Sequence, residues 1–313
     1  MTANEFNQCC IADLKGAGLS DYVVVVGAGP SSPYIAPVSE LIRSLAKACG
    51  VDQGEGEELW VFCEKAHSAN PADYFRIIRE SFGDTPYWDS RIYKYLVSTP
   101  FRNFLTLNYD RQLPEAFAEK FEDDHDDRFR VYPPKPGDSY FSPSEFVSGK
   151  NQLMAVHGFA NPKDSDWETR VILRLEDYNG HYTGPNPRLF EWWQSVLATT
   201  PCLFLGTSLR EPGLASVFKH SPDSLLDAIG SKGHIHLLPC DPTGNPPEYR
   251  AAGESFPGVR QLYFDPLDRR YSGLIQVLEA FSSYRRITPN PRTKSVPALS
   301  ATEPLGLPDV PRS

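Results

Sequence analysis

Four short groups of residues that could bind a substrate or assist its chemistry each follow a run of apolar residues. They are residues 27–31 (GAGPS), 108–110 (NYD), 157–158 (HG) and 206–208 (GTS). The amide of Asn108 could hold a water molecule or a hydroxyl group, because an asparagine side chain both donates and accepts hydrogen bonds. The imidazole of His157 could accept a proton near neutral pH. Such side chains suffice to position water and remove a proton, without a redox centre or a metal.

The first group resembles a nucleotide-binding loop without matching a complete pattern. Gly27 and Gly29 fit the first two glycines of G-x-G-x-x-G, but Ser32 stands at the third position. No acidic residue is evident about 20 positions later, which disfavours a simple Rossmann dehydrogenase. The P-loop pattern G-x-x-x-x-G-K-[ST] does not occur, which excludes a P-loop ATPase. Taken singly, each group also has a structural explanation, such as a tight turn or a helix cap.

The elements that must position these groups are predicted strands alternating with helices. Residues 22–26 (YVVVV) form a β-branched run without polar alternation, which is typical of a strand buried on both faces of a parallel sheet. Further strands are predicted at residues 104–107, 153–156, 171–175, 202–205, 235–238 and 261–264. The alternation predicts an α/β fold with a doubly wound parallel sheet. Because ligands bind outside the carboxyl ends of such strands, the four groups are expected to share one site.

The predicted domain organisation is one catalytic domain over residues 1–286 and a tail. Helical spacing of apolar residues between about 50 and 100 predicts a helical insert between two strands. Residues 133–150, rich in Pro, Gly and Ser, are predicted to form a loop. Residues 287–313 contain six prolines in 27 residues and little periodicity, which predicts a flexible tail or partner-binding arm.

Composition excludes several classes of protein. The 313 residues include 31 Lys plus Arg against 40 Asp plus Glu, a net charge of −9, so no broad attraction to nucleic acid or anionic membranes is expected. No apolar run approaches the roughly 20 residues of a membrane span, and the N-terminus lacks a secretory signal pattern. The six cysteines form no C-x-x-C pair, and His234 and His236 lack further spaced ligands, so no metal is expected. We therefore expect a cytoplasmic protein with reduced cysteines.

The order of the motifs resembles a known family. The segments GAGPS (27–31), LTLNYD (105–110), AVHG (155–158) and LFLGTSLREPGL (203–214) are similar to the sirtuin-like NAD-consuming domains, over about residues 20–285. In that family the glycine loop wraps the NAD diphosphate, the Asn and His catalyse, and the G-x-S loop holds a ribose. The resemblance implies NAD binding by Gly27, Ala28, Gly29, Ser31 and Asp110, catalysis by Asn108 and His157, and nucleotide contacts by Gly206 and Ser208.

Two departures narrow the resemblance. First, deacylase sirtuins carry four zinc-binding cysteines in two C-x-x-C pairs, and this sequence has no such pair. Second, deacylase sirtuins have a loop like G-I-P-D-F-R after the glycines, where this sequence has residues 32–37 (SPYIAP). The sequence thus looks like the bacterial sirtuin-like NAD hydrolases that defend cells against phage by destroying NAD. This implies a NAD glycohydrolase that releases nicotinamide and ADP-ribose, used in abortive infection. Control through a homo-oligomer or a protein partner is also implied, such as a HerA-type ATPase or a short prokaryotic Argonaute.

Two alternative functions stay open. The first is NAD-dependent protein deacylation, which the missing cysteines count against. The second is a non-catalytic subunit that binds NAD or ADP-ribose, which the presence of both Asn108 and His157 counts against.

Overall fold

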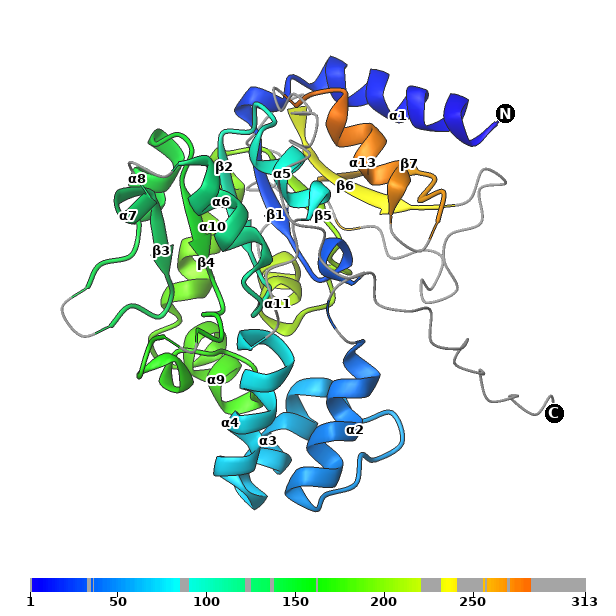
Figure 1. Cartoon of the computed structure of the whole chain (residues 1–313). Coiled ribbons are helices and arrows are strands. Elements are labelled where there is room, and N and C mark those ends of the chain that lie inside the picture. Colours follow the sequence, from blue (N-terminus) through cyan, green and yellow to red (C-terminus); the bar gives the residue numbers. More distant parts are fainter. Residues whose placement is uncertain are drawn as a thin grey trace, which may run out of the picture.

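One parallel sheet forms the centre of the molecule (Figure 1). A computed structural model describes residues 2–32, 35, 37–84, 90–121, 125–135, 138–161, 163–220, 232–240, 256, 258–268 and 271–282. Within these residues seven strands pair in the order β3-β4-β2-β1-β5-β6-β7, and every pairing is parallel. The strands are β1 (Val23–Val26), β2 (Asn103–Thr106), β3 (Phe129–Val131), β4 (Leu153–Ala155), β5 (Cys202–Leu205), β6 (His234–Pro239) and β7 (Val259–Phe264).

The four valines of β1 explain why this strand lies at the middle of the sheet. All four are fully buried, and β1 pairs with β2 on one side and β5 on the other. A β-branched strand without polar alternation suits burial on both faces. The doubly wound, Rossmann-like α/β fold predicted from the sequence is confirmed.

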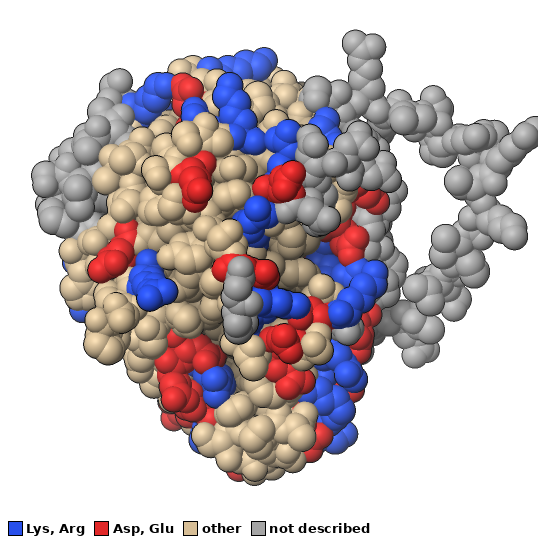
Figure 2. Space-filling model, turned by 90° about the vertical axis from the view of Figure 1, so that its left-hand side faces the viewer, with Lys and Arg blue, Asp and Glu red and all other residues tan. Residues whose placement is uncertain are grey.

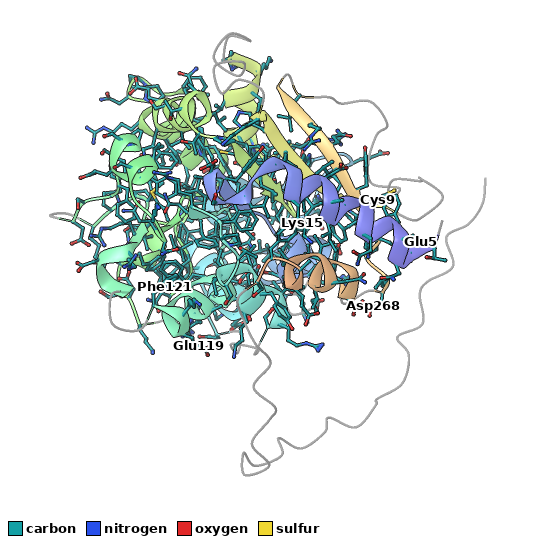
Figure 3. The ribbon with its side chains drawn as sticks, turned by 90° about the horizontal axis from the view of Figure 1, so that it is seen from above. Glu5, Cys9, Lys15, Glu119, Phe121 and Asp268 are labelled. Atoms are coloured by element: carbon teal, nitrogen blue, oxygen red, sulfur yellow. The ribbon has the colours of Figure 1, made fainter. Side chains whose placement is uncertain are left out.

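Alternate valines of β1 belong to two separate cores, one on each face of the sheet. Val24 and Val26 pack in the first core, and Val23 and Val25 pack in the second. The helices on the first face are α1 (Ala3–Ala17), α5 (Arg91–Val97), α6 (Gln112–Lys120) and α13 (Ser272–Glu279). The helices on the second face are α8 (Pro143–Ser148), α10 (Arg188–Thr199) and α11 (Pro212–His220). Figure 3 shows α1, with Cys9 and Lys15, beside α13.

A third core holds a group of helices together below the sheet in Figure 1. The group consists of α2 (Val38–Cys49), α3 (Leu59–Ala69) and α4 (Pro71–Ile78). Trp167 and Leu173, which follow β4, pack into the same core and tie the group to the sheet domain. The group differs from the predicted insert, because it begins with α2, and α5 instead covers the first face of the sheet.

Several local predictions were wrong. Residues 171–173 form no strand, because Val171 and Leu173 pack into the third core and Ile172 into the second, without a neighbouring strand. Instead α9 (Leu175–Tyr178) begins within the predicted strand. The predicted loop 133–150 contains α8, which starts at a capping box formed by Ser142 and Glu145. The sequence analysis missed β3, the short edge strand after α7 (His125–Arg128).

The surface carries charges of both signs. On the face shown in Figure 2, Lys and Arg side chains are interspersed with Asp and Glu among the described residues. No helix in the described part of the chain has both the length and the apolar character needed to cross a membrane. The predicted tail, residues 287–313, lies outside the described residues.

Candidate functional site

The strand order reverses at β1, so that the chain builds one half of the sheet first and the other half afterwards. The chain passes from β1 to β2 on one side, and later enters β5 on the other side of β1. In an open parallel sheet the loops at such a point diverge and leave a crevice at the carboxyl ends of the strands. A cavity of about 900 Å³ occupies this position. All nine sequence-predicted residues line it: Gly27, Ala28, Gly29, Ser31, Asn108, Asp110, His157, Gly206 and Ser208.

The glycines bring the loops after β1 and β5 into direct contact. The backbone N–H of Gly27 donates to the Leu205 carbonyl, and that of Gly29 donates to the Gly206 carbonyl, each at 2.9 Å. A Cβ atom on Gly27 would lie 2.7 Å from the Gly206 oxygen, so a larger residue does not fit there. Because these two N–H groups bond within the protein, they do not point into the cavity as donors for a ligand, although both glycines line the cavity wall.

The side chain of Asn108 is held by three hydrogen-bond acceptors. Its Nδ2 donates to the Gly27 carbonyl at 3.0 Å and to the hydroxyls of Ser31 and Tyr93 at 3.3 Å each. Its backbone N–H donates to the hydroxyl of Thr106 at 3.1 Å. With both amide hydrogens engaged, Asn108 can offer a ligand only its carbonyl oxygen.

Asp110 anchors the same network from a buried position. Its Oδ2 accepts a hydrogen bond from Ser31 Oγ at 2.8 Å, and its Oδ1 accepts one from the backbone N–H of Gln112 at 2.9 Å. Burial raises the pKa of the Asp110 carboxyl, and the hydrogen bonds from Gln112 and Ser31 oppose this rise. Tyr93, a member of this network, was missed by the sequence analysis, since a tyrosine on a buried helical face has no signal beyond that of a core residue.

His157 lines the cavity but has no solvent-exposed surface. Its Nε2 lies 2.9 Å from the hydroxyl of Tyr182, which belongs to the π-helical turn Asn179–Thr183. Trp193 Nε1–H donates to the same hydroxyl at 3.2 Å. Since the Tyr182 oxygen already accepts this bond, its own proton can be donated to His157 Nε2. A neutral His157 then carries its proton on Nδ1.

Burial lowers the pKa of His157, which favours this neutral form. The Glu211 carboxylate, 3.7 Å from Nε2, acts in the opposite direction, as does the backbone of Leu107. Glu211 also accepts hydrogen bonds from the backbone N–H groups of Gly213 and Leu214, at 2.9 and 2.8 Å, and so caps α11. The Glu211 carboxylate thus both caps the N-terminus of α11 and lies close to His157.

A hydrogen bond from β6 fixes the loop that follows β5. The backbone carbonyl of Thr207 accepts a hydrogen bond from His236 Nε2 at 2.8 Å, which leaves this buried histidine engaged within the fold. Ser208 is exposed at the cavity wall, and its hydroxyl accepts a hydrogen bond from the backbone of Arg210 at 3.3 Å. His234 accepts a hydrogen bond from the Cys202 backbone at 3.1 Å. The described residues contain no group of three or more His, Cys, Asp or Glu placed to hold a metal.

Aromatic residues complete the cavity, and three of them, Trp60, Phe82 and Tyr178, were not predicted from the sequence to line it. Trp60 of α3 and Phe82 line the cavity, together with Tyr109 and Tyr178. The ring of Tyr178 lies edge-on to His157, with centroids 5.5 Å apart, and Trp60 packs edge-on against Tyr178 at 6.3 Å. Phe82 and Tyr109 pack against the third core, whereas Tyr178 and Trp60 pack in the second. The two cores together therefore supply the apolar part of the cavity wall.

Two comparisons with known proteins found a similarity. Residues 102–256 match a family model described as the SIR2-like domain. This match includes Asn108, His157 and Gly206 but not the glycine loop after β1. A solved structure described as "Structural Basis for the Mechanism and Regulation of Sir2 Enzymes" is 13% identical, with a TM-score of 0.42, and the alignment covers 89% of this chain and 97% of that chain. No curated protein matches the sequence. The segment that carries Asn108, His157 and the glycine turn after β5 thus matches the SIR2-like domain.

Proposed function

We propose that the protein hydrolyses NAD to nicotinamide and ADP-ribose. The observation that carries this proposal is the presence of Asn108 and His157 in one cavity at the carboxyl edge of the sheet, within a SIR2-like domain. The volume of about 900 Å³ lies in the range of pockets that enclose a small-molecule ligand. Apolar walls on one side and polar strand ends on the other suit a dinucleotide with flat rings and hydroxyl-rich sugars.

The proposed reaction breaks the bond between the nicotinamide nitrogen and the ribose. The bonding electron pair leaves with nicotinamide, and the anomeric carbon develops positive charge. A water molecule attacks that carbon and loses one proton, so NAD and water yield nicotinamide, ADP-ribose and a proton. The Asn108 carbonyl oxygen accepts a hydrogen bond from the water or a ribose hydroxyl and places it for attack. His157 accepts the proton once its Nε2 has exchanged the hydrogen bond with Tyr182.

The engaged state of His157 favours regulation as part of this function. A histidine that is fully buried and bonded through Nε2 to Tyr182 has to give up this bond before Nε2 can accept a proton from a substrate. We propose that the protein acts as an abortive-infection effector against phage, and that a homo-oligomer or a protein partner controls it. The family resemblance supports a HerA-type ATPase or a short prokaryotic Argonaute as the partner.

The same observation keeps a second candidate function open. A subunit that binds NAD or ADP-ribose without cleaving it would also hold His157 away from the substrate. Calorimetry with ADP-ribose and chromatography with NAD separate the two functions, because a binding subunit gives heat without nicotinamide release. Deacylation is tested in the same assay with an acetylated peptide, whose consumption would favour the deacylase alternative.

The experiment incubates the purified full chain with NAD and follows nicotinamide and ADP-ribose by chromatography, with and without the candidate partner. Asn108→Ala and His157→Ala should each lower turnover by about 10²–10⁴-fold, the range for a lost positioning or acid–base group. Asn108→Asp and His157→Gln keep similar volumes and guard against misfolding, with thermal unfolding as the control. Turnover close to that of the native protein in a well-folded variant would remove that residue from the mechanism.

A further inference from the structure

Tyr93 places a hydroxyl group beneath the cavity without lining it. It lies in the first turn of α5, has no exposed surface, and is absent from the cavity wall. Its ring belongs to the first core, where a phenylalanine would pack equally well. A buried hydroxyl costs free energy unless it is hydrogen-bonded, so its bonds indicate what the oxygen contributes.

The hydrogen bonds around Tyr93 have a definite direction. Ser31 Oγ–H donates to the Asp110 carboxylate at 2.8 Å, so the single Ser31 proton is committed. The contact of 2.6 Å between Tyr93 and Ser31 must then use the Tyr93 proton, with Ser31 Oγ as acceptor. The Tyr93 oxygen is left to accept from Asn108 Nδ2 at 3.3 Å. The direction runs from Asn108 through Tyr93 and Ser31 to Asp110.

This chain selects one orientation of the Asn108 amide. In the observed orientation Nδ2 faces the three acceptors, Gly27 O, Ser31 Oγ and Tyr93 Oη. A rotation of the amide by half a turn would bring the carbonyl oxygen against the Gly27 carbonyl, which has no proton to donate. Without the Tyr93 hydroxyl, one acceptor is lost and the second amide hydrogen depends on Ser31 alone.

We propose that Tyr93 is a positioning residue, which fixes the Asn108 amide so that its carbonyl oxygen faces the substrate. The consequence for turnover rests on the proposed NAD hydrolysis, whereas the orientation itself is a property of the protein alone. Tyr93 also connects the helices on the first face of the sheet with the cavity. Its helix α5 packs against α6 and α13, and its hydroxyl bonds to Asn108 at the cavity.

The chain offers a matched control on the same helix. Tyr95 is also buried in the first core, and its hydroxyl donates to Glu279 at 2.9 Å, away from the cavity. Tyr93→Phe and Tyr95→Phe each remove one hydroxyl from α5 and leave the ring. Any effect specific to Tyr93→Phe therefore reports the link to Asn108 rather than a weakened helix.

The orientation is tested first without substrate. In protein labelled with ¹⁵N-asparagine, the Asn108 side-chain amide signals are assigned as those lost in Asn108→Ala. Tyr93→Phe should shift these signals and speed their exchange with water, while Tyr95→Phe leaves them unchanged. Unchanged Asn108 signals in Tyr93→Phe would overturn the proposal, whatever the protein does to NAD.

The consequence is tested by steady-state NAD hydrolysis. Tyr93→Phe should lower kcat by about 10-fold with KM within about twofold, because a misplaced group slows the reaction more than it weakens binding. Ser31→Ala interrupts the same chain, so the double variant should lose less than the product of the two single losses. A kcat equal to that of the native protein, or fully additive losses, would overturn the role. If the native protein hydrolyses no NAD under any condition, the proposed function fails, and the spectra alone decide the role of Tyr93.

Discussion

At the residue scale, the two candidate catalytic side chains are each controlled by a tyrosine that the sequence analysis did not single out. Tyr93 accepts from Asn108, and Tyr182 holds His157 Nε2. Both tyrosines are buried, so their hydroxyl bonds are protected from competition with water. Each candidate catalytic side chain is therefore hydrogen-bonded to a tyrosine that does not line the cavity.

Tyr182→Phe should raise the pKa of His157. A hydroxyl that donates to Nε2 stabilises the neutral ring, so its removal makes protonation easier. The Glu211 carboxylate remains close to Nε2 and favours the same change. The measurement is an NMR titration of the His157 ring protons in the native protein and the variant.

Tyr132→Phe is the matched control for this titration. It removes a similar tyrosine–histidine contact, between Tyr132 Oη and His181 Nδ1 at 3.2 Å, from residues that do not line the cavity. It should leave the pKa of His157 unchanged. A His157 pKa that stays constant or falls in Tyr182→Phe would show that Tyr182 does not donate to this histidine.

His234 should make the fold sensitive to acid. Burial lowers its pKa from 6.5 to about 4, so the unfolded chain binds the proton more readily than the folded one. The contribution of neutral His234 to the unfolding free energy is fully present above the unfolded pKa near 6.5. It is lost as pH falls toward the folded pKa of about 4, and the loss is on the order of 3 kcal/mol. Denaturant unfolding at several pH values in this window measures the loss.

The variant His234→Asn tests this assignment. An asparagine carbonyl can replace Nδ1 as the acceptor for the Cys202 backbone N–H, but it does not titrate. The unfolding free energy of the variant should vary less with pH between 6.5 and 4. An unchanged pH dependence would assign the acid sensitivity to other histidines, such as the buried His157 and the half-buried His181, whose pKa values desolvation also lowers.

At the element scale, the cavity exists because the turns after β1 and β5 touch through glycines. Gly206 adopts a left-handed backbone conformation, with φ of +67°, and a Cβ atom there would overlap Pro30. The glycine after β1 and the glycine after β5 therefore constrain each other, although they are far apart in sequence. Their contact sets the spacing of the two loops that form the cavity wall.

Gly206→Ala should lower the unfolding free energy more than Gly18→Ala. Both positions have a positive φ, which costs an alanine about 1–2 kcal/mol. At Gly18, with φ of +73°, no atom lies within 4 Å of the added Cβ, whereas at Gly206 the two loops must separate. Denaturant unfolding measures both losses, and calorimetry with NAD should show weaker binding for Gly206→Ala alone. Equal losses at the two positions would contradict the contact.

At the scale of the whole molecule, the cavity lies between a sheet domain and a helical group with its own core. Trp60 and Tyr178 contact each other across this boundary, and Arg174 donates to His67 of α3 at 3.0 Å while it pairs with Asp177 of α9. A change in how the helical group packs would therefore reach Tyr178, which lies against His157. This connection offers a route by which a bound partner could alter the site.

We expect NAD hydrolysis by the isolated chain to be weak and to change with protein concentration or with the candidate partner. Removal of residues 287–313 should weaken partner binding and leave the thermal midpoint unchanged, because proline-rich sequences lose little entropy when they dock in an extended conformation. Turnover, light scattering and partner pull-down on both forms measure this. A monomer that hydrolyses NAD at full rate, regardless of concentration, partner or tail, would place control in expression instead.

The sequence by itself determined the central strands of the sheet and the residues at their carboxyl ends. A β-branched run such as that of β1 specifies a buried strand through local properties of the chain. Since parallel strands end at one edge, residues that follow them must gather there, and this is why Asn108, His157 and Gly206 could be assigned to one cavity.

Only the tertiary structure decided the partners of those residues. Tyr93 meets Ser31 across 62 positions, and Tyr182 meets His157 across 25. Helical periodicity indicates that a face is buried but does not show which core receives it, so α2 and α5 could not be assigned to their cores. The apolar run at residues 171–175 was predicted to be a strand because the sequence does not show that Val171 and Leu173 pack among helices. The hydrogen bonds of Tyr93 and Tyr182 depend on how helices from separate cores pack against the loops of the cavity. This packing is determined by residues throughout the chain and cannot be inferred from a local pattern.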